Sequence, residues 1–460
     1  MDLLDLAPDA VKKALAAGAE QAEAYAIRYA TRHVYMEDDV PKVAEDREET
    51  GLGLKVAQGK RVAFTSTTLA RASDVPAAVR TAIRGLAQVP EDPDFAGLAT
   101  AAGRGEVAAV YDAATAETGV DGLLEGAQDF VRAAVETKGV SVPKATFRLQ
   151  AYAQRIANSN GIDASHRGTL VFGYLTAKAG SGSDVGEGIV HGVRPALRNL
   201  DFPELGRTCA RRAKENREAE TYHGKLAGVA VLDPEEIGAL FLQSVGAAVA
   251  GQNIQKKRSP WVGKVGQEVG SASLTIRDKP RMPGGILSAT SDDEGAATKD
   301  RTLVGAGILK GYVADTYHAR LLGAEAGNAL RRGAASLEGA YLHPAENAVS
   351  NLVLEPGVKS LEDLLAEVDR GVYVEKFAAP ELNPFSGAFA CEVRNATLIE
   401  KGERKAHVKY ALLTGNFYDG LKNVDGIGRD LTPVPTFYGS PGCAYVPPMA
   451  FAGFELVGQT

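Results

Sequence analysis

Cysteine is scarce in this chain, with only Cys209, Cys391 and Cys443 among 460 residues. These three lie far apart and are odd in number, so they form neither a disulfide framework nor a Cys-x-x-Cys metal site. No apolar run approaches the roughly 20 residues that a membrane-spanning helix needs. Residues 1–5 are acidic and lack the basic flank and apolar stretch of a secretion signal. We therefore predict a cytoplasmic protein with no membrane association.

Positive charge is also limited. The formal net charge is -7, and residues 256–258 form the longest run of Lys and Arg. Because such a balance opposes binding to a phosphate backbone, we predict no nucleic-acid partner. Apolar residues make up 45% of the chain and charged residues 24%, which is typical of soluble globular proteins. A chain of 460 residues is too long for one compact core, so we expect two domains.

The first part of the chain mixes helical and extended patterns, which predicts an α+β domain over residues 1–220. Leu52, Leu54 and Val56 alternate with polar or small residues, as expected of a strand with one buried face. Gly59 sits in a short connection typical of a hairpin. The pattern predicts helices at residues 9–17, 74–86, 120–136 and 205–217, strands at 22–29, 33–43, 52–57, 61–65, 146–157 and 168–177, and a loop or hairpin at 180–188.

The second part, residues 221–460, is rich in β-forming residues separated by Gly, Pro and Asn, which predicts a mostly β domain. One amphipathic helix is expected near its start. Apolar residues recur at helical spacing from Ile237 to Val249, after the helix-start sequence Asp233-Pro234-Glu235. A second helix is expected at residues 360–368.

Several short strings follow one another in a fixed order along the chain. They lie at residues 47–64, 90–95, 158–161, 292–295, 307–311, 315–320, 383–387 and 415–430. In this order and spacing they resemble the TldD/PmbA ("modulator of gyrase") family. The most specific part is the succession from Asp292-Asp-Glu-Gly295 to Arg320, and the resemblance covers nearly the whole chain.

The resemblance implies an N-terminal α/β sandwich-like domain, a C-terminal, mostly β, barrel-like domain, and a dimer. In this family, one type of subunit carries zinc on a His-Glu-x-x-x-His helix, with a C-terminal cysteine as a further ligand. The partner type lacks this site. Together such pairs are implied to cleave small or unfolded peptides.

The zinc helix of the family would fall on the amphipathic helix near Leu240. Leu242 then stands in place of the first His, Gln243 in place of the Glu, and Ala247 in place of the second His. Leu and Ala side chains offer no lone pair to Zn²⁺, and an amide is not a general base near neutral pH. Catalytic zinc needs three protein ligands and an open position for water. We therefore expect no metal or cofactor in this chain, and zinc in a partner subunit.

The resemblance and the residue types together nominate five substrate-binding candidates. Asp292, Asp293 and Glu294 could hold a cation or a peptide amine, or could form a solvated turn. Asn383 could bond an extended peptide backbone, or simply form an Asn-Pro turn. Cys443, near the family's cysteine ligand, could be a remnant of that site or a structural cysteine.

These observations predict a non-catalytic, peptide-binding subunit of a TldD/TldE-type metalloprotease complex. It would pair with a zinc-bearing TldD-like subunit as a heterodimer, or form a homodimer. The alternative is a stand-alone homodimeric peptidase or hydrolase that uses Cys443 or the carboxylate cluster at residues 292–294. A DNA-binding regulator is disfavoured by the negative net charge.

Overall fold

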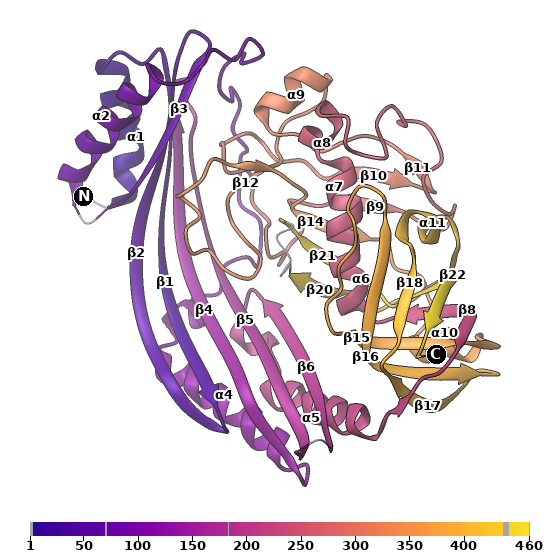
Figure 1. The fold of residues 1–460 in the computed structure, drawn as a ribbon. Helices are drawn as coiled ribbons and strands as arrows, with labels where there is room; N and C mark the ends of the chain where they lie inside the picture. The colour runs from indigo at the N-terminus through magenta and orange to yellow at the C-terminus, as the bar shows by residue number, and fades with distance from the viewer. Residues whose placement is uncertain (1–2, 70, 183, 436–440, 460) are drawn as a thin grey trace.

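The computed structural model describes residues 3–69, 71–182, 184–435 and 441–459. A six-stranded antiparallel sheet of order β3-β2-β1-β4-β5-β6 dominates the first half of the described chain. Its long strands curve strongly from one end of the molecule to the other (Figure 1). The strands are β1 (Gln21–Glu37), β2 (Val40–Gln58), β3 (Arg61–Thr68), β4 (Val140–Asn158), β5 (Asp163–Ser181) and β6 (Asp184–Arg194).

Helices cover one face of this sheet because even-numbered residues of β1 turn small or apolar side chains toward them. Ala22, Ala24 and Ala26 pack in one cluster with α1 and α2, and Val34 and Met36 pack in another with α4 and α5. The two helix pairs therefore lie at opposite ends of the same face (Figure 1). The bounds are α1 (Leu6–Ala16), α2 (Val75–Leu86), α3 (Ala113–Glu117), α4 (Val120–Val135) and α5 (Phe202–Glu218).

The opposite face of the sheet packs on the second half of the chain. Tyr25, Ile27 and Tyr29, at odd positions of β1, are buried in one cluster with residues such as Leu337 and Tyr341. A strand whose two faces are both buried cannot show a simple apolar–polar alternation. This explains why the continuous strand β1 looks fragmentary in the sequence.

A five-stranded barrel forms the core of the second half, as expected. Its strands run in the order β15 (Arg370–Phe377), β8 (Lys225–Leu232), β22 (Met449–Val457), β18 (Leu412–Asn416) and β16 (Ala388–Glu400). Pairing of β15 with β16 closes the ring. The strands β17 (Glu403–Lys409) and β7 (Glu220–Thr221) extend the sheet from β16, and β19 (Val424–Ile427) pairs with β22. The fold is thus mixed α+β with a β-rich, barrel-containing C-terminal half.

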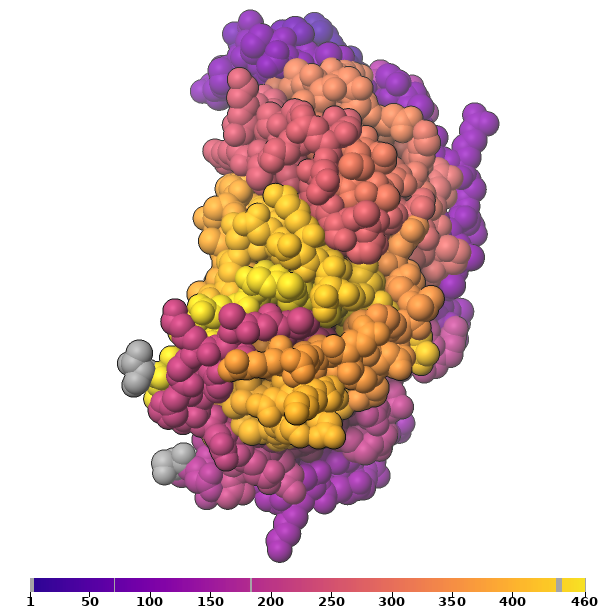
Figure 2. All heavy atoms as spheres, turned by 90° about the vertical axis from the view of Figure 1, so that its right-hand side faces the viewer, coloured from indigo at the N-terminus to yellow at the C-terminus, as the bar shows by residue number. Residues whose placement is uncertain are grey.

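A second six-stranded sheet and several short helices complete the second half of the described chain. This sheet has the order β11 (Ile308–Leu309), β10 (Arg301–Gly305), β9 (Ile276–Asp278), β14 (Asn351–Leu354), β21 (Cys443–Val446) and β20 (Thr432–Pro435). Other elements of this half are β12 (Ala329–Leu330), β13 (Glu346–Asn347), α8 (Gly251–Gln255), α9 (Thr316–Leu322), α10 (Leu361–Ala366) and α11 (Phe417–Lys422). Seen from the barrel side, the second half covers most of the face, and the first half emerges at its top, right-hand edge and base (Figure 2).

The expected helices agree with the structure, but one expected strand needs correction. Residues 33–43 are not one strand: they contain the turn between β1 and β2, where Asp38 and Asp39 have positive φ angles. The segment 180–188 belongs to a hairpin between β5 and β6, as one of the two expectations for it had it. The sequence did not reveal β6, which begins within this segment. Among the described residues, no helix has the length and apolar character to cross a membrane. We propose a domain division between residues 220 and 221, which falls within β7.

Candidate functional site

The amphipathic helix identified in the sequence forms one wall of the candidate site. It begins as α6 (Pro234–Phe241) after Asp233, whose Oδ1 caps the Glu235 backbone N–H at 3.1 Å. It continues through a π-helical turn, Leu242–Gly246, into α7 (Ala247–Val249). No local pattern in the sequence predicts this π turn, and such turns often lie at functional sites. Here it contains Leu242 and Gln243, two of the three positions that the resemblance matches to a zinc site, and Ala247 follows it directly.

A cavity of about 520 Å³ lies beside the π turn. Leu242, Gln243 and Ala247 all line it, so the three positions expected to replace a metal site are brought together on one surface. Segments far away in the sequence complete the wall, namely residues 346–349, residues 381–385 except Asn383, and Pro441. We call this space the helix cavity.

Gln243 links the helix to the segment that faces it. Its Nε2 donates to the carbonyl oxygens of Ala239 at 3.2 Å and Pro380 at 2.6 Å. Its Oε1 accepts the backbone N–H of Leu382 at 3.2 Å. The side chain is buried and uses both its donor and its acceptor. A carboxylate at this position could not donate to Pro380.

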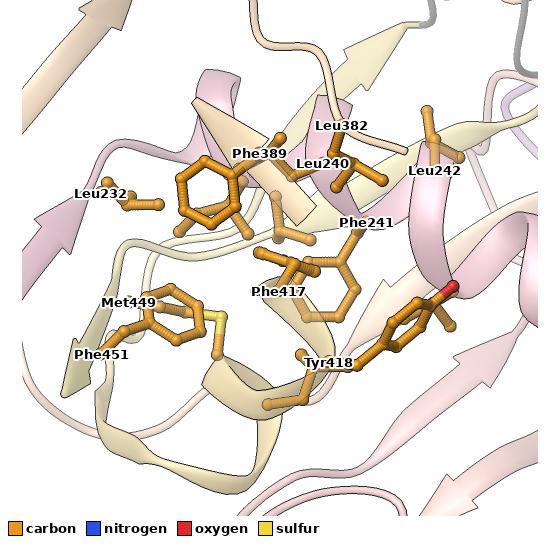
Figure 3. Close-up of a cluster of buried hydrophobic side chains, with 14 of the residues drawn as sticks. Leu232, Leu240, Phe241, Leu242, Leu382, Phe389, Phe417, Tyr418, Met449 and Phe451 are labelled. Carbon is orange, nitrogen blue, oxygen red and sulfur yellow. The ribbon is translucent and has the colours of Figure 1, made fainter. Parts of the chain in front are cut away.

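Tyr418 supports the π turn from the barrel side. Its hydroxyl lies 3.0 Å from the Ser244 carbonyl oxygen and 2.5 Å from that of Pro384, both of which are acceptors. Figure 3 shows the hydroxyl pointing at the helix beside Leu242, with Phe241 and Phe417 packed next to it. Those two rings meet edge to face with centroids 5.4 Å apart. The apolar core therefore fixes the side of the helix that faces away from the cavity.

The residues of the helix cavity do not fit a zinc ion. Leu242 and Ala247 have no ligand atoms, and the amide of Gln243 is consumed by backbone bonds. Among the described residues, no group of three or more His, Cys, Asp or Glu side chains is arranged to hold a metal. The chemistry of these side chains therefore provides no Lewis acid at this surface.

The segment before Cys443 approaches the helix, as the resemblance implies. Cys443 itself is not one of the residues that line the helix cavity. Gly442 has φ +116°, and a Cβ placed on it would lie 2.9 Å from the Val349 carbonyl oxygen and 3.1 Å from Leu242 Cδ2. Cys443 itself is fully buried in β21 and packs with the cluster between the two halves. Burial raises the pKa of this thiol to about 12. Such a thiol is protonated at neutral pH, which does not suit a nucleophile.

The carboxylates of residues 292–294 form a buried junction. Asp292 and Asp293 have exposures of 1% and 0%, so the solvated-turn interpretation of this segment is wrong. Asp292 accepts the backbone N–H groups of Glu294, Ala296 and Ala329 at 2.8 to 3.0 Å. These bonds fold the segment back on itself.

Asp293 forms an ion pair with Arg332, with Oδ1 3.0 Å from Nε. The same oxygen accepts from Gln154 of β4 at 3.0 Å, so the contact bridges the two halves of the molecule. Burial acts to raise the pKa of Asp293, but the Arg332 guanidinium and the surrounding N–H donors hold it below its usual value. Burial, reinforced by the charge of Glu294, raises the pKa of Asp292 well above its usual value.

Glu294 is the member of this cluster that lines a cavity. Its Oε1 lies 2.6 Å from Lys55 Nζ, and its Oε2 accepts the Thr316 backbone N–H at 3.1 Å. The cavity, about 440 Å³, is also lined by Glu23, Lys55 and His318. Burial opposes ionisation of Glu294, yet the charge of Lys55 lowers its pKa to about 2. Glu23 and Lys55 lie far away in the sequence, in plain strand patterns, so nothing in the sequence indicated them.

Asn383 forms a turn in the structure. Its side chain is exposed, and Oδ1 accepts the backbone N–H groups of Phe385 and Ser386, each at 3.0 Å. Its neighbours Leu382 and Pro384 line the helix cavity. The turn therefore shapes the cavity rim. The substrate-binding roles of Asp292, Asp293, Glu294, Asn383 and Cys443 stay predictions.

Comparison with protein families agrees with this architecture. The PmbA/TldA metallopeptidase C-terminal domain matches residues 228–458, half of the chain. The chain belongs to the PmbA/TldD metallopeptidase family. The central domain of the same family matches residues 111–217, and its domain 1 matches residues 22–86.

Individual PmbA/TldD relatives match parts of the chain. It is 32% identical over 188 residues to the Metalloprotease TldD homolog of Haemophilus influenzae. That match covers 41% of this chain and 38% of the relative. It is 25% identical over 299 residues to Metalloprotease PmbA of Escherichia coli O157:H7. That match covers 60% of this chain and 62% of the relative. These matches span less than two thirds of the relatives' own length.

Solved structures of the PmbA/TldD type match nearly the whole chain in fold. TldE from Thermococcus kodakarensis superimposes with a TM-score of 0.88 at 23% identity, covering 98% of this chain and 99% of that one. A Thermotoga maritima structure, described as a proposed modulator of a DNA gyrase, gives a TM-score of 0.82 at 21% identity, with 98% of each chain covered. At these identities the likeness shows the fold alone.

Proposed function

We propose that this chain is the non-catalytic, peptide-binding subunit of a TldD/TldE-type metalloprotease complex. One observation supports the proposal above all others. The surface that would hold zinc in a metal-bearing subunit carries Leu242, Gln243 and Ala247, yet it still borders an open cavity of about 520 Å³. These side chains provide neither zinc ligands nor a general base, while the helix cavity beside them has room for a ligand.

The chain would supply binding and shape to the complex, and its partner would supply the chemistry. Peptide hydrolysis at a metal needs a Lewis acid and a base that activates water. Gln243 serves as a backbone link, and the thiol of Cys443 is buried. The proposal therefore includes a zinc-bearing TldD-like subunit as partner, with a homodimer as the other possible assembly, and a peptide substrate in the cytoplasm.

The test is a cleavage assay on unstructured peptides, with the purified chain alone and mixed with a zinc-bearing TldD-like subunit. The chain alone, after chelator treatment, should cleave nothing. The mixture should cleave, and zinc analysis should place the metal in the partner. A partner variant that lacks its zinc-helix His residues is the matched control, and it should abolish cleavage in the mixture.

The alternative, a stand-alone peptidase, predicts the reverse result. Robust cleavage by the chelated chain alone, removed by Cys443→Ala or by Glu294→Gln, would replace the present proposal. The surroundings of Cys443 do not favour this alternative, because burial raises the pKa of its thiol to about 12.

A further inference from the structure

Asn347, a residue of the helix cavity, has a side-chain donor with no partner among the described residues. The residue belongs to the short strand β13, is 1% exposed, and is one of the residues that line the cavity. Its Oδ1 accepts the backbone N–H of Gly251 at 2.8 Å. Its Nδ2 is buried and has no hydrogen-bond partner among the residues that the structure describes.

The orientation of this amide is fixed by its one bond. The Gly251 backbone N–H can only donate, so the atom that faces it must be the carbonyl oxygen of the Asn347 side chain. The NH₂ group then points the other way. A buried donor left without an acceptor costs free energy, and such groups are rare in folded proteins. An acceptor supplied by a ligand would remove that cost.

The charges around the helix cavity restrict the kind of acceptor. Glu346 and Glu381 are exposed at its wall, and no Lys, Arg or His occurs among the described residues that line it. A ligand carboxylate or phosphate would meet these two acidic groups with no compensating cation. A neutral amide carbonyl faces no such penalty, and a basic side chain beside it would be attracted.

We propose that Asn347 donates a hydrogen bond to a main-chain carbonyl of an extended peptide in the helix cavity. Glu346 and Glu381 make this site prefer peptides with basic side chains over acidic ones. This inference rests on the proposed peptide-binding function and adds to it a specific donor and a class of substrate.

The experiment measures binding of a fluorescein-labelled, unstructured octapeptide of Ala, Ser and Leu to the purified chain by fluorescence anisotropy. Asn347→Asp keeps an acceptor for Gly251 but replaces the NH₂ donor with a second oxygen. It should weaken binding at least tenfold, as expected for a lost donor that becomes a repulsive acceptor. Asn423→Asp, an exposed asparagine away from the cavity, is the matched control and should leave binding unchanged.

A second variant, Asn347→Ala, tests the proposal even if Asn347→Asp fails to fold. Asn347→Ala removes the amide without adding charge, and Gly251 N–H keeps its 2.9 Å bond to the Val313 carbonyl oxygen. This variant should also weaken binding about tenfold. Octapeptides with two Lys residues should bind more tightly than those with two Glu residues. That difference should vanish in the double variant Glu346→Gln/Glu381→Gln.

A cavity-filling variant, Ala247→Phe, tests separately whether peptide binds in the helix cavity and whether Asn347 is the donor. If the chain binds peptide and Ala247→Phe abolishes binding while both Asn347 variants bind normally, the helix cavity is the site and the role of Asn347 is refuted. If Ala247→Phe has no effect, peptide binds elsewhere and the inference fails while peptide binding stands. If no peptide binds the wild-type chain, with or without its partner, the proposed function itself fails.

Discussion

Gln243 shows how one side chain separates a binding surface from a catalytic one. Its amide donates to Pro380 and accepts from Leu382, and so it ties the helix to the segment across the cavity. A carboxylate would provide a base but would face the Pro380 carbonyl oxygen with no proton to donate. The same position cannot serve both purposes in this backbone arrangement.

Gln243→Glu should therefore lower the stability of the chain without restoring metal binding. The lost donor and the buried charge should reduce the free energy of unfolding by about 2 kcal/mol. Urea unfolding followed by fluorescence measures the change. Gln267→Glu, at an exposed glutamine, is the matched control and should have little effect. A fully stable Gln243→Glu protein would mean that the link to Pro380 contributes nothing.

Asp293→Asn should cost more, because it leaves the buried guanidinium of Arg332 without its counter-charge. Both side chains are at most 1% exposed. Removing one partner of a buried ion pair typically costs about 3 to 5 kcal/mol. Calorimetry should show a large fall in Tm, whereas Glu325→Gln, in an exposed pair with Lys299, should leave Tm almost unchanged. Equal effects of the two substitutions would contradict the structural role of Asp293.

At the scale of elements, one buried carboxylate contributes two ion pairs to the contact between helix α5 and the barrel. Glu375 of β15 bonds the guanidinium groups of Arg211 at 2.5 and 3.0 Å and Arg212 at 2.8 Å. Burial would raise the pKa of Glu375, but the two arginines lower it from 4.5 to about 2. This contact joins the first sheet's helix layer to the barrel, because α5 packs on β6 and β15 is a barrel strand.

The depressed pKa makes this junction sensitive to acid. A folded-state pKa below the unfolded value contributes stability above about pH 4.5, and that stability is lost as the pH falls toward 2. The difference in free energy of unfolding between wild type and Glu375→Gln should reach about 3 kcal/mol near pH 6 and shrink on acidification. Urea titrations at several pH values measure it. Glu362→Gln, in an exposed pair with Arg404, should show a smaller dependence, and a pH-independent Glu375 difference would refute the argument.

Helices and strands could be predicted from the sequence where a segment has one apolar face that packs on the core and one face toward solvent. Helix α6 and its Asp233 cap were predicted from apolar spacing and the Asp-Pro-Glu start, and Leu52, Leu54 and Val56 do share a buried face. The π turn after α6 could not be predicted, because its extra residue leaves no local signature. Strand β6 was missed because Gly-rich sequence hid its alternation.

At the scale of the whole molecule, the resemblance predicted the barrel, but not the hydrogen bonds of the polar groups at the site. Asn347 becomes informative, and the hydrogen bonds of Gln243 become visible, only when distant segments meet across the cavity. Glu294 likewise acquires its partner Lys55 from a strand in the other half of the chain. Such pairings depend on tertiary contacts that no local pattern encodes.

We predict that the chain is not a monomer in solution, as the family resemblance implies. Light scattering at micromolar concentration should give a mass above the 48.2 kDa of one chain, either alone or after mixing with a zinc-bearing relative. Maltose-binding protein, run in parallel, calibrates a monomer of similar size. A mass of one chain under both conditions would exclude both the homodimer and the heterodimer.

The closure of the barrel has a consequence for how the chain is made. Strand β8 pairs with β15 on one side and with β22 on the other, and residues 233–448 separate it from β22. During synthesis, β8 therefore leaves the ribosome with one hydrogen-bonding edge that stays open until the β22 sequence has followed. Contacts between such distant segments form slowly. The nascent second half must pass through a stage with an exposed strand edge, when it is most open to aggregation and to capture by chaperones.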